Sequence, residues 1–524
     1  MKKAFTVFSL FLCLCLLLSA CAPGTPEQTT AQDTEAPPEQ PILSAPDQSV
    51  NSLFALPYCY NAAGVFNPIL VHNEACDPLF ALLYDGLFAV DSKGNVQPRL
   101  ALDYASDENS FTVTLREDAL FHDGTPVKAS DVVWSLKMAK ENEASAYAGR
   151  FSDVTDISAK DGRTVVLILK REHGSLAHCL DVPIVKNGTG ITNNAVGSGR
   201  YRIVEQEESM YLMANESWYA RPMDSLFPTD LIILTYVDGL DDLVYSMVSG
   251  NSNLVRLDPF IFRDKKISGN CDTFPVLSRE FLYIAFNTSY YAPTGSSAVR
   301  KALAHAIDVS ALLADPYAGV VYSAGLYPES VTGTPAPAPA KPDPAETARA
   351  LRAEGYRFIA NQWVDAEGEV LSLTVLCGRD STKQAAAELI AADLAKAGVS
   401  CTVKISDNVA AAMENGNFDV AVCETTLSPD YDFTYLLAYE GSENFNQFVV
   451  PGLDVLLSDF LAAGHTNGAD LSAQINAVLA DSMPIIPIGY KQDTVCISRE
   501  FAFGNVQVSE SDPFINLFDW ISYR

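Results

Sequence analysis

The fold of this chain is decided by the stretch Leu79–Ala139, which reads LFALLYDGLFAVDSKGNVQPRLALDYASDENSFTVTLREDALFHDGTPVKASDVVWSLKMA. Apolar and polar residues alternate over Phe111–Arg116, and this alternation predicts a half-buried strand. A tight turn is expected at His122–Pro126. From about Ala129 the apolar residues take helical spacing, which predicts an α-helix. No residue of the stretch stands in a catalytic motif, so we expect it to serve as scaffold.

The chain begins with a basic segment and then an apolar one. Lys2 and Lys3 precede an apolar run that closes with Leu-Ser-Ala-Cys at Cys21. A run this short predicts a secretory signal over residues 1–20 rather than a membrane-spanning helix. Leu-Ser-Ala-Cys resembles the bacterial lipobox, which implies that Cys21 is acylated and becomes the first residue of the mature protein. The alternative is an ordinary signal with a chance cysteine.

A linker is expected behind this cysteine. Residues 21–48 are rich in Pro, Thr, Gln and Glu and contain almost nothing that a core could bury. This composition predicts a disordered, extended tether, with the folded part beginning near Val50. The tether would let the folded body stand away from its lipid anchor.

Length and charge narrow the class of protein. A chain of 524 residues is long enough for about three domains or lobes. Its formal net charge of −30 at pH 7 argues against nucleic acid as a partner and against electrostatic adhesion to anionic lipid. We therefore expect contact with the membrane through the lipid anchor alone.

The sequence gives little support for an enzyme. It lacks the motifs that mark nucleophilic hydrolases, zinc proteases and phosphate-binding loops. Its six histidines show no metal-ligand spacing, and its 11 cysteines include no Cys-x-x-Cys pair. Three of these cysteines lie in the signal or at the lipid site, and we expect the remaining eight to be mostly free thiols. We predict no catalytic residue, no metal site and no cofactor.

Segments spread over the folded part match one known pattern. They are Tyr84–Leu87, Pro98–Ala101, Phe111–Arg116, Phe121–Leu136, Gly197–Ile203, Phe281–Thr288, Val299–Asp308 and Met483–Tyr490. Together they resemble the signature of family 5 extracellular solute-binding proteins, the lipoproteins and periplasmic proteins that serve peptide and nickel ABC importers. The resemblance runs from about residue 50 to the C-terminus, and it departs from the family at Arg200, where the family pattern has proline.

The resemblance implies an α/β, two-lobed periplasmic-binding-protein-like fold (type II, cluster C) with an extra α+β subdomain on lobe one. The implied boundaries are 49–78, 197–280 and 487–524 for lobe one, 79–196 for the accessory subdomain and 281–486 for lobe two. The residues themselves agree with a parallel α/β sheet in the second half. There, an alanine-rich helix at Lys383–Ala397, closed by Gly398, lies between two strand-like runs.

The resemblance also implies a function. It implies a lipid-anchored substrate-binding protein on the outer side of the cell membrane, or in the periplasm, that works as a monomer with an ABC permease. The solute would be a peptide or a peptide-like molecule held between two closing lobes. A nickel-binding or metal-chelate-binding member of the same family is the runner-up within this class. The competing class is a surface lipoprotein that serves sensing or adhesion without transport, and an exported hydrolase is the weakest alternative.

The resemblance also places the ligand site. In peptide-binding relatives an aspartate after a strand of lobe two holds the ligand's α-ammonium, and the matching run here is Ser428–Asp432, with Ser428 at the aspartate's position and Asp430 or Asp432 as substitutes. The candidate ligand-binding residues are Tyr58, Tyr60, Trp363, Arg379, Ser428, Asp430, Tyr431, Asp432, Asn444 and Phe445. For the aromatic residues the alternative role is packing, and for Arg379 it is a surface guanidinium.

Overall fold

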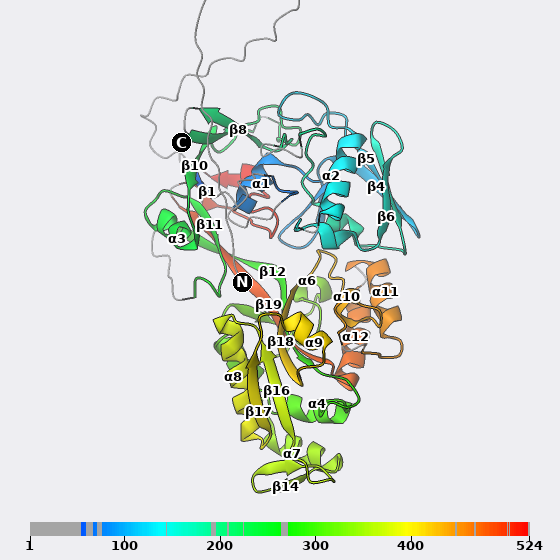
Figure 1. Cartoon of the computed structure of the whole chain (residues 1–524). Helices are drawn as coiled ribbons and strands as arrows, with labels where there is room; N and C mark the ends of the chain where they lie inside the picture. The colour runs from blue at the N-terminus through cyan, green and yellow to red at the C-terminus, as the bar shows by residue number, and fades with distance from the viewer. Residues whose placement is uncertain are drawn as a thin grey trace, which may run out of the picture. The chain divides into compact units, whose positions relative to one another are not determined.

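The computed structural model of the protein describes residues 54–58, 67–70, 76–142, 144–189, 195–206, 209–223, 225–263, 271–445, 448–465, 468–499, 501 and 503–521 (Figure 1). Within these ranges the strands form one seven-stranded sheet, two four-stranded sheets and three two-stranded sheets, with helices packed around them. No helix in the same ranges is long and apolar enough to span a bilayer. The predicted signal, Cys21, the linker and Tyr60 lie outside the described residues.

The first four-stranded sheet brings together distant parts of the chain. Its order is β1 (Phe54–Tyr58), β10 (Leu231–Tyr236), β9 (Ser209–Ala214) and β8 (Tyr201–Gln206). β1 and β10 run parallel, while the other neighbours are antiparallel. Helix α1 (Asp77–Leu83) contacts β1 and β8, and its apolar residues, Leu79 and Leu82 among them, are buried in the same core.

The accessory sheet is the second four-stranded sheet. Its order is β4 (Ala101–Asp107), β5 (Ser110–Leu115), β7 (Thr164–Leu169) and β6 (Val154–Ala159). Phe111, Val113 and Leu115 are buried and alternate with less buried residues, which confirms the predicted half-buried strand. The predicted helix is α2 (Ala129–Glu141), which contacts β6 and β7.

Two long antiparallel strands connect the parts of the molecule that carry the first sheet and the seven-stranded sheet (Figure 1). They are β12 (Cys271–Phe286) and β19 (Ile485–Ser498). Val276 of β12 lies in the core of the first sheet, whereas Phe281 lies in a core beside the seven-stranded sheet. The pairing register shifts between Leu277 and Phe281, so the strand pair is irregular between the two cores.

The seven-stranded sheet has the order β11, β19, β12, β18, β16 and β17, with β13 paired to β19. Its bounds are β11 (Leu254–Leu257), β13 (Val320–Tyr322), β16 (Ser372–Cys377), β17 (Ser400–Ile405) and β18 (Val420–Thr426). Helix α8 (Ser381–Lys396) joins the parallel strands β16 and β17, as predicted. Gly398 follows the helix with φ of +84°, and a Cβ there would lie 2.4 Å from the Phe358 ring, so glycine is needed at this helix end.

The remaining elements are short and surround these sheets. They are β2 (Phe88–Val90), β3 (Val96–Pro98), η2 (Ala148–Phe151), η3 (Leu176–Leu180), α3 (Leu240–Val248), α4 (Ser297–Ala304), α5 (Val309–Ala314), α6 (Glu329–Thr332), α7 (Pro344–Ala353), β14 (Arg357–Ile359), β15 (Gln362–Val364), α9 (Val409–Glu414), α10 (Thr434–Leu437), α11 (Leu453–Ala463), α12 (Gly468–Ser482), β20 (Phe503–Gly504), η5 (Leu517–Asp519) and β21 (Trp520–Ile521). The seven described cysteines are free thiols.

Candidate functional site

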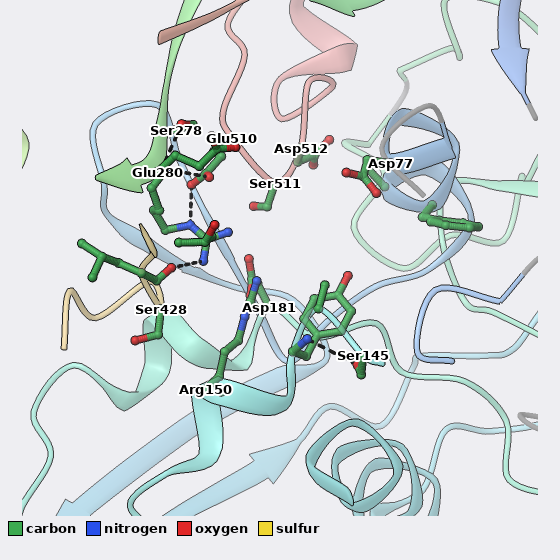
Figure 2. Close-up of a pocket in the computed structure, with 18 of the residues that line it drawn as sticks. Asp77, Ser145, Arg150, Asp181, Ser278, Glu280, Ser428, Glu510, Ser511 and Asp512 are labelled. Atoms are coloured by element: carbon green, nitrogen blue, oxygen red, sulfur yellow. Dashed lines mark hydrogen bonds and ion pairs between the residues drawn. The ribbon is translucent and has the colours of Figure 1, made fainter. Parts of the chain in front are cut away.

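A cavity of about 850 Å³ lies where the first sheet, the accessory part (the accessory sheet with α2, η2 and η3) and the seven-stranded sheet meet. Its walls come from α1, residues 144–152, β12, the end of β18, β19 and residues 510–512, which are far apart in the sequence. Figure 2 shows charged side chains of the lining around one space, with Arg150 and Asp181 facing Glu280 and Glu510 across it. Many of these charges are paired with one another.

Arg279 of β12 is held by the C-terminal segment. Its Nε donates to Glu510 Oε2 at 2.7 Å, and its Nη1 donates to the carbonyl of Leu427 at 3.1 Å. Burial alone would raise the pKa of Glu510, but the charges of Arg279 and Arg256 lower it below its usual value. The carboxylate of Glu510 is therefore ionised, and Arg279 is fixed at the cavity wall.

Lys491 of β19 lies between two carboxylates. Its Nζ is 2.6 Å from Asp258 Oδ2 and 2.6 Å from Glu280 Oε1. Burial lowers the pKa of Lys491, but the two hydrogen bonds outweigh burial and raise it above its usual value. The pKa of Glu280 is also raised, mainly because of burial. This triad joins β12 and β19 at the point where both strands line the cavity.

Two more arginines close the side of the cavity that faces α1 and the accessory part. Arg150 pairs with Asp181, and both side chains are almost completely buried. The Nη2 of Arg200 donates to both carboxylate oxygens of Asp512, at 2.8 and 2.7 Å. These contacts join segments that lie 31 and 312 residues apart.

The structure places two of the predicted site residues, Ser428 and Asp432, in the cavity lining. Asp430, between them, is outside the lining, and its buried carboxylate is 2.9 Å from the Nε2 of His173. Tyr431 takes a φ of +55°, a conformation rare for a residue with a side chain. Ser428 and Asp432 therefore line the cavity, whereas Asp430 and the predicted Tyr431 do not.

The other predicted site residues lie elsewhere. Trp363 is 2% exposed within a hydrophobic core, and its Nε1 donates to the carbonyl of Ala397 at 2.8 Å. The exposed Arg379 pairs with Asp407 outside the cavity. These side chains do not belong to the described lining, because one is used for packing and the other extends into solvent.

Asn444, Phe445 and Tyr58 complete the set of described candidates. The amide of Asn444 donates to the carbonyls of Ala438 and Phe448, at 2.8 Å each, which shapes a loop. Asn444 and Phe445 line a separate surface depression. The backbone of Tyr58 ends β1, and its side chain lies outside the described residues.

Most charged residues of the lining were missed by the sequence analysis. Arg279 and Glu510 are 231 residues apart, and Lys491 and Asp258 are 233 apart, so no local pattern connects the partners. One feature of the sequence did point to a charged residue of the lining. Arg200 departs from the family pattern, and the structure gives it a buried carboxylate partner in Asp512.

The chemistry of the lining fits recognition of a polar, charged solute. Within the described residues no group of three or more His, Cys, Asp and Glu side chains is arranged to hold a metal ion. The lining instead offers hydroxyls such as Ser145 and Ser428, carboxylates, and guanidinium groups fixed by ion pairs. Such pre-oriented groups can bind a ligand with little loss of side-chain entropy.

The sequence of this chain is similar to those of several known proteins. The model of bacterial extracellular solute-binding proteins, family 5 Middle, matches residues 95–447. The nickel-binding periplasmic protein of Escherichia coli (strain K12) is 24% identical over 458 residues, which cover 82% of this chain and 80% of the relative. The periplasmic murein peptide-binding protein MppA of the same organism is 25% identical over 464 residues, covering 78% and 82%.

Solved structures show the same fold. The unliganded open form of MppA has a TM-score of 0.71 at 19% identity and covers 86% of this chain and 94% of its own. The oligopeptide-binding protein AppA of Bacillus subtilis, in complex with a nonapeptide, has a TM-score of 0.63 at 16% identity, covering 90% and 99%. The predicted α/β, two-lobed fold is thereby confirmed. Because the family model spans more than half of the sequence, the chain belongs to family 5 of the bacterial extracellular solute-binding proteins.

Proposed function

We propose that this protein is the lipid-anchored, extracellular substrate-binding component of an ABC importer and that its solute is a short peptide. In this proposal, lobe one (49–78, 197–280 and 487–524), with its accessory subdomain (79–196), and lobe two (281–486) close over the cavity. The closed form delivers the peptide to a membrane permease. The protein acts as a monomer held at the membrane through Cys21.

The observation that carries the peptide assignment is an edge of β18 beside the cavity. β16 pairs with β18 only at Val420 and Ala421, although β18 continues to Thr426. No other strand within the described residues pairs with this remaining edge, and Thr425 and Thr426 line the cavity. An extended peptide can add itself as a strand at such an edge, where its backbone groups form the hydrogen bonds.

The cavity also suits a peptide in size and polarity. Its volume of about 850 Å³ lies within the range of roughly 300–1,000 Å³ that is typical of small-molecule sites. Asp432 lines this cavity and is the residue that we propose for the terminal ammonium of the peptide. Asp430 is already engaged by His173 and is assigned a structural role.

A metal chelate is the second candidate, because one relative of comparable length is a nickel-binding periplasmic protein. The described residues offer no cluster of metal ligands, so a metal ion would have to arrive with its own chelator. An uptake assay distinguishes a transport protein from a lipoprotein that only senses its ligand. Import of a labelled peptide would stop when the permease is deleted if the protein serves transport.

Chemical denaturation with added ligand tests the proposal. A ligand that binds only the folded protein stabilises it by RT ln(1 + [L]/Kd), about 2.7 kcal/mol at a hundredfold excess over Kd. We expect such stabilisation from members of a short-peptide library and none from a nickel–histidine complex. Stabilisation by the complex alone would favour the second candidate, and no stabilisation by any peptide would refute the proposal.

A further inference from the structure

The formal charge of the cavity lining is negative. Among its described residues are ten carboxylate side chains and six basic ones, an excess of four negative charges. The basic residues are Arg99, Arg150, Arg200, Arg256, Arg279 and Lys491. The carboxylates are Asp77, Asp85, Asp181, Asp258, Glu280, Asp432, Glu443, Asp493, Glu510 and Asp512.

Every basic side chain of the lining already has a carboxylate of the lining within 4 Å. The pairs are Arg99–Asp512 at 3.9 Å, Arg200–Asp512 at 2.7 Å, Arg256–Asp493 at 2.7 Å, Arg279–Glu510 at 2.7 Å, Lys491 with Asp258 and Glu280 at 2.6 Å each, and Arg150–Asp181. An acidic ligand group would therefore have to compete with a carboxylate that is already in place.

Some carboxylates of the lining are not paired with any of these six basic residues. No ion pair within 4 Å is found for Asp85 or Glu443 among the described residues, and the nearest cation to Asp432 is Arg171 at 3.9 Å, which is outside the lining. Asp85 accepts a hydrogen bond from the Nε1 of Trp218 at 2.8 Å. Asp432 and Glu443 lie at the α10 end of the cavity, because Asp432 accepts from the backbone of Thr434 and the Glu443 amide donates to the carbonyl of Tyr435.

Asp493 adds an independent sign of an incomplete site. Its Oδ2 pairs with Arg256, but its buried Oδ1 has no hydrogen-bond partner within the described residues. The side chain is 8% exposed and lines the cavity. A buried carboxylate oxygen without a partner is unfavourable, and a donor from the ligand would satisfy it.

We infer that the solute of this cavity is a cation, namely a short peptide with at least one basic side chain, whose side-chain ammonium or guanidinium group neutralises Glu443 at the α10 end, beside the terminal ammonium at Asp432. That the solute is a peptide rests on the proposed function, and that it is positively charged rests on the charge of the lining. Closure of the lobes removes these carboxylates from water, which is unfavourable unless the ligand supplies a positive charge. A neutral peptide leaves that charge uncompensated, and an acidic peptide adds to it.

Calorimetric titration of the full mature protein with three matched tripeptides tests the inference. The probes are Ala-Lys-Ala, Ala-Gln-Ala and Ala-Glu-Ala, which differ in the charge of one unbranched side chain. We expect the lysine peptide to bind about tenfold or more tightly than the glutamine peptide, and the glutamate peptide to bind most weakly. Spermidine, an organic cation without peptide bonds, is titrated in parallel.

A variant and a matched control locate the effect. Glu443→Gln removes a carboxylate of the lining and should reduce the preference for lysine over glutamine. Glu367→Gln makes the same chemical change at an exposed residue outside the lining and should leave the preference unchanged. Added salt should weaken the preference less than it weakens an exposed ion pair, because the cavity is partly shielded from solvent.

The outcomes separate the two proposals. Equal affinities, or tightest binding of the glutamate peptide, would overturn the charge preference while leaving a peptide site in place. Binding of spermidine without any peptide would support the charge preference and overturn the peptide assignment. No binding of any of the four probes would overturn the preference, whereas binding of neutral peptides from the library would still support the proposed function.

Discussion

The Nε2 of His173 lies 2.9 Å from the Oδ2 of Asp430, so that the segment after β7 is tied to the turn after β18. The two residues are 257 positions apart, and their side chains are only 3% and 4% exposed. Beside them, the Gly174 amide donates to the carbonyl of Leu461 at 2.8 Å. The pair thus belongs to a contact that holds the accessory part against α11.

Contact between these two side chains favours the charged form of each in the folded protein. Burial lowers the pKa of His173, but the hydrogen bond and charge of Asp430 outweigh burial and raise it above its usual 6.5. Burial raises the pKa of Asp430, but His173 brings it below its usual 3.8. The stabilisation is therefore complete between about pH 3.8 and 6.5, and the contribution of His173 is lost as pH rises through its raised pKa.

His173→Gln should therefore destabilise the protein more in acid than in base. We expect a loss of about 3–5 kcal/mol in the free energy of unfolding at about pH 6, because one member of a buried ion pair is removed, and a smaller loss at about pH 9. Urea denaturation at the two pH values measures both. His305→Gln, at an exposed position after α4, is the control and should change stability by no more than about 0.5 kcal/mol. Equal losses for His173→Gln at both pH values would contradict the charged pair.

Asp430→Asn and Asp432→Asn should have different effects, although the residues are only two positions apart. Asp432→Asn should weaken binding of peptides with a free terminal amine by about tenfold or more, because a charged hydrogen bond is lost. Binding of the same peptides after N-acetylation should change little. Asp430→Asn should lower the free energy of unfolding instead, since Asp430 pairs with His173 outside the lining. Titration and denaturation of both variants test this division, and it is wrong if Asp430→Asn impairs binding without loss of stability.

Binding of a basic peptide should weaken as pH falls. The pKa of Asp432 is raised above its usual 3.8 by burial and by the charge of Asp430, and burial raises the pKa of Glu443 above its usual 4.5. A bound cation lowers both pKa values, so binding releases protons and affinity is lost as pH falls through the raised values. Calorimetry at about pH 5 in two buffers of different ionisation enthalpy should detect this release. Proton uptake on binding would contradict the placement of the cation beside these carboxylates.

The lipid anchor predicts a change of location. Cys21→Ser removes the thiol that would be acylated, so we expect the protein to appear in the medium, or in the soluble fraction of the periplasm, instead of the membrane fraction. Immunoblots of the two fractions measure the shift. Retention of the variant at the membrane in the same amount as the parent protein would contradict the anchor at Cys21.

The sequence predicted elements whose pattern is local. The alternation in β5 and the alanine-rich α8 with Gly398 behind it are encoded within a few residues, and both are present as predicted. The cavity is different, because all of its ion pairs except Arg150–Asp181 join residues more than 200 positions apart, such as Arg279 and Glu510. Trp363 shows that a residue type in a local pattern does not by itself give the role of the side chain. An aromatic residue near a loop can line a site or fill a core, and only the packing around it decides between the two.

Mass spectrometry of the solute that co-purifies with the protein tests the peptide assignment and the charge preference together. The full chain is expressed in its host, purified without denaturation, and measured first intact and then after unfolding. We expect a one-to-one adduct that is released as short peptides containing Lys or Arg. Recovery of a metal chelate or of a non-peptide solute, or an empty protein that forms no adduct when the peptide library is added, would contradict this expectation.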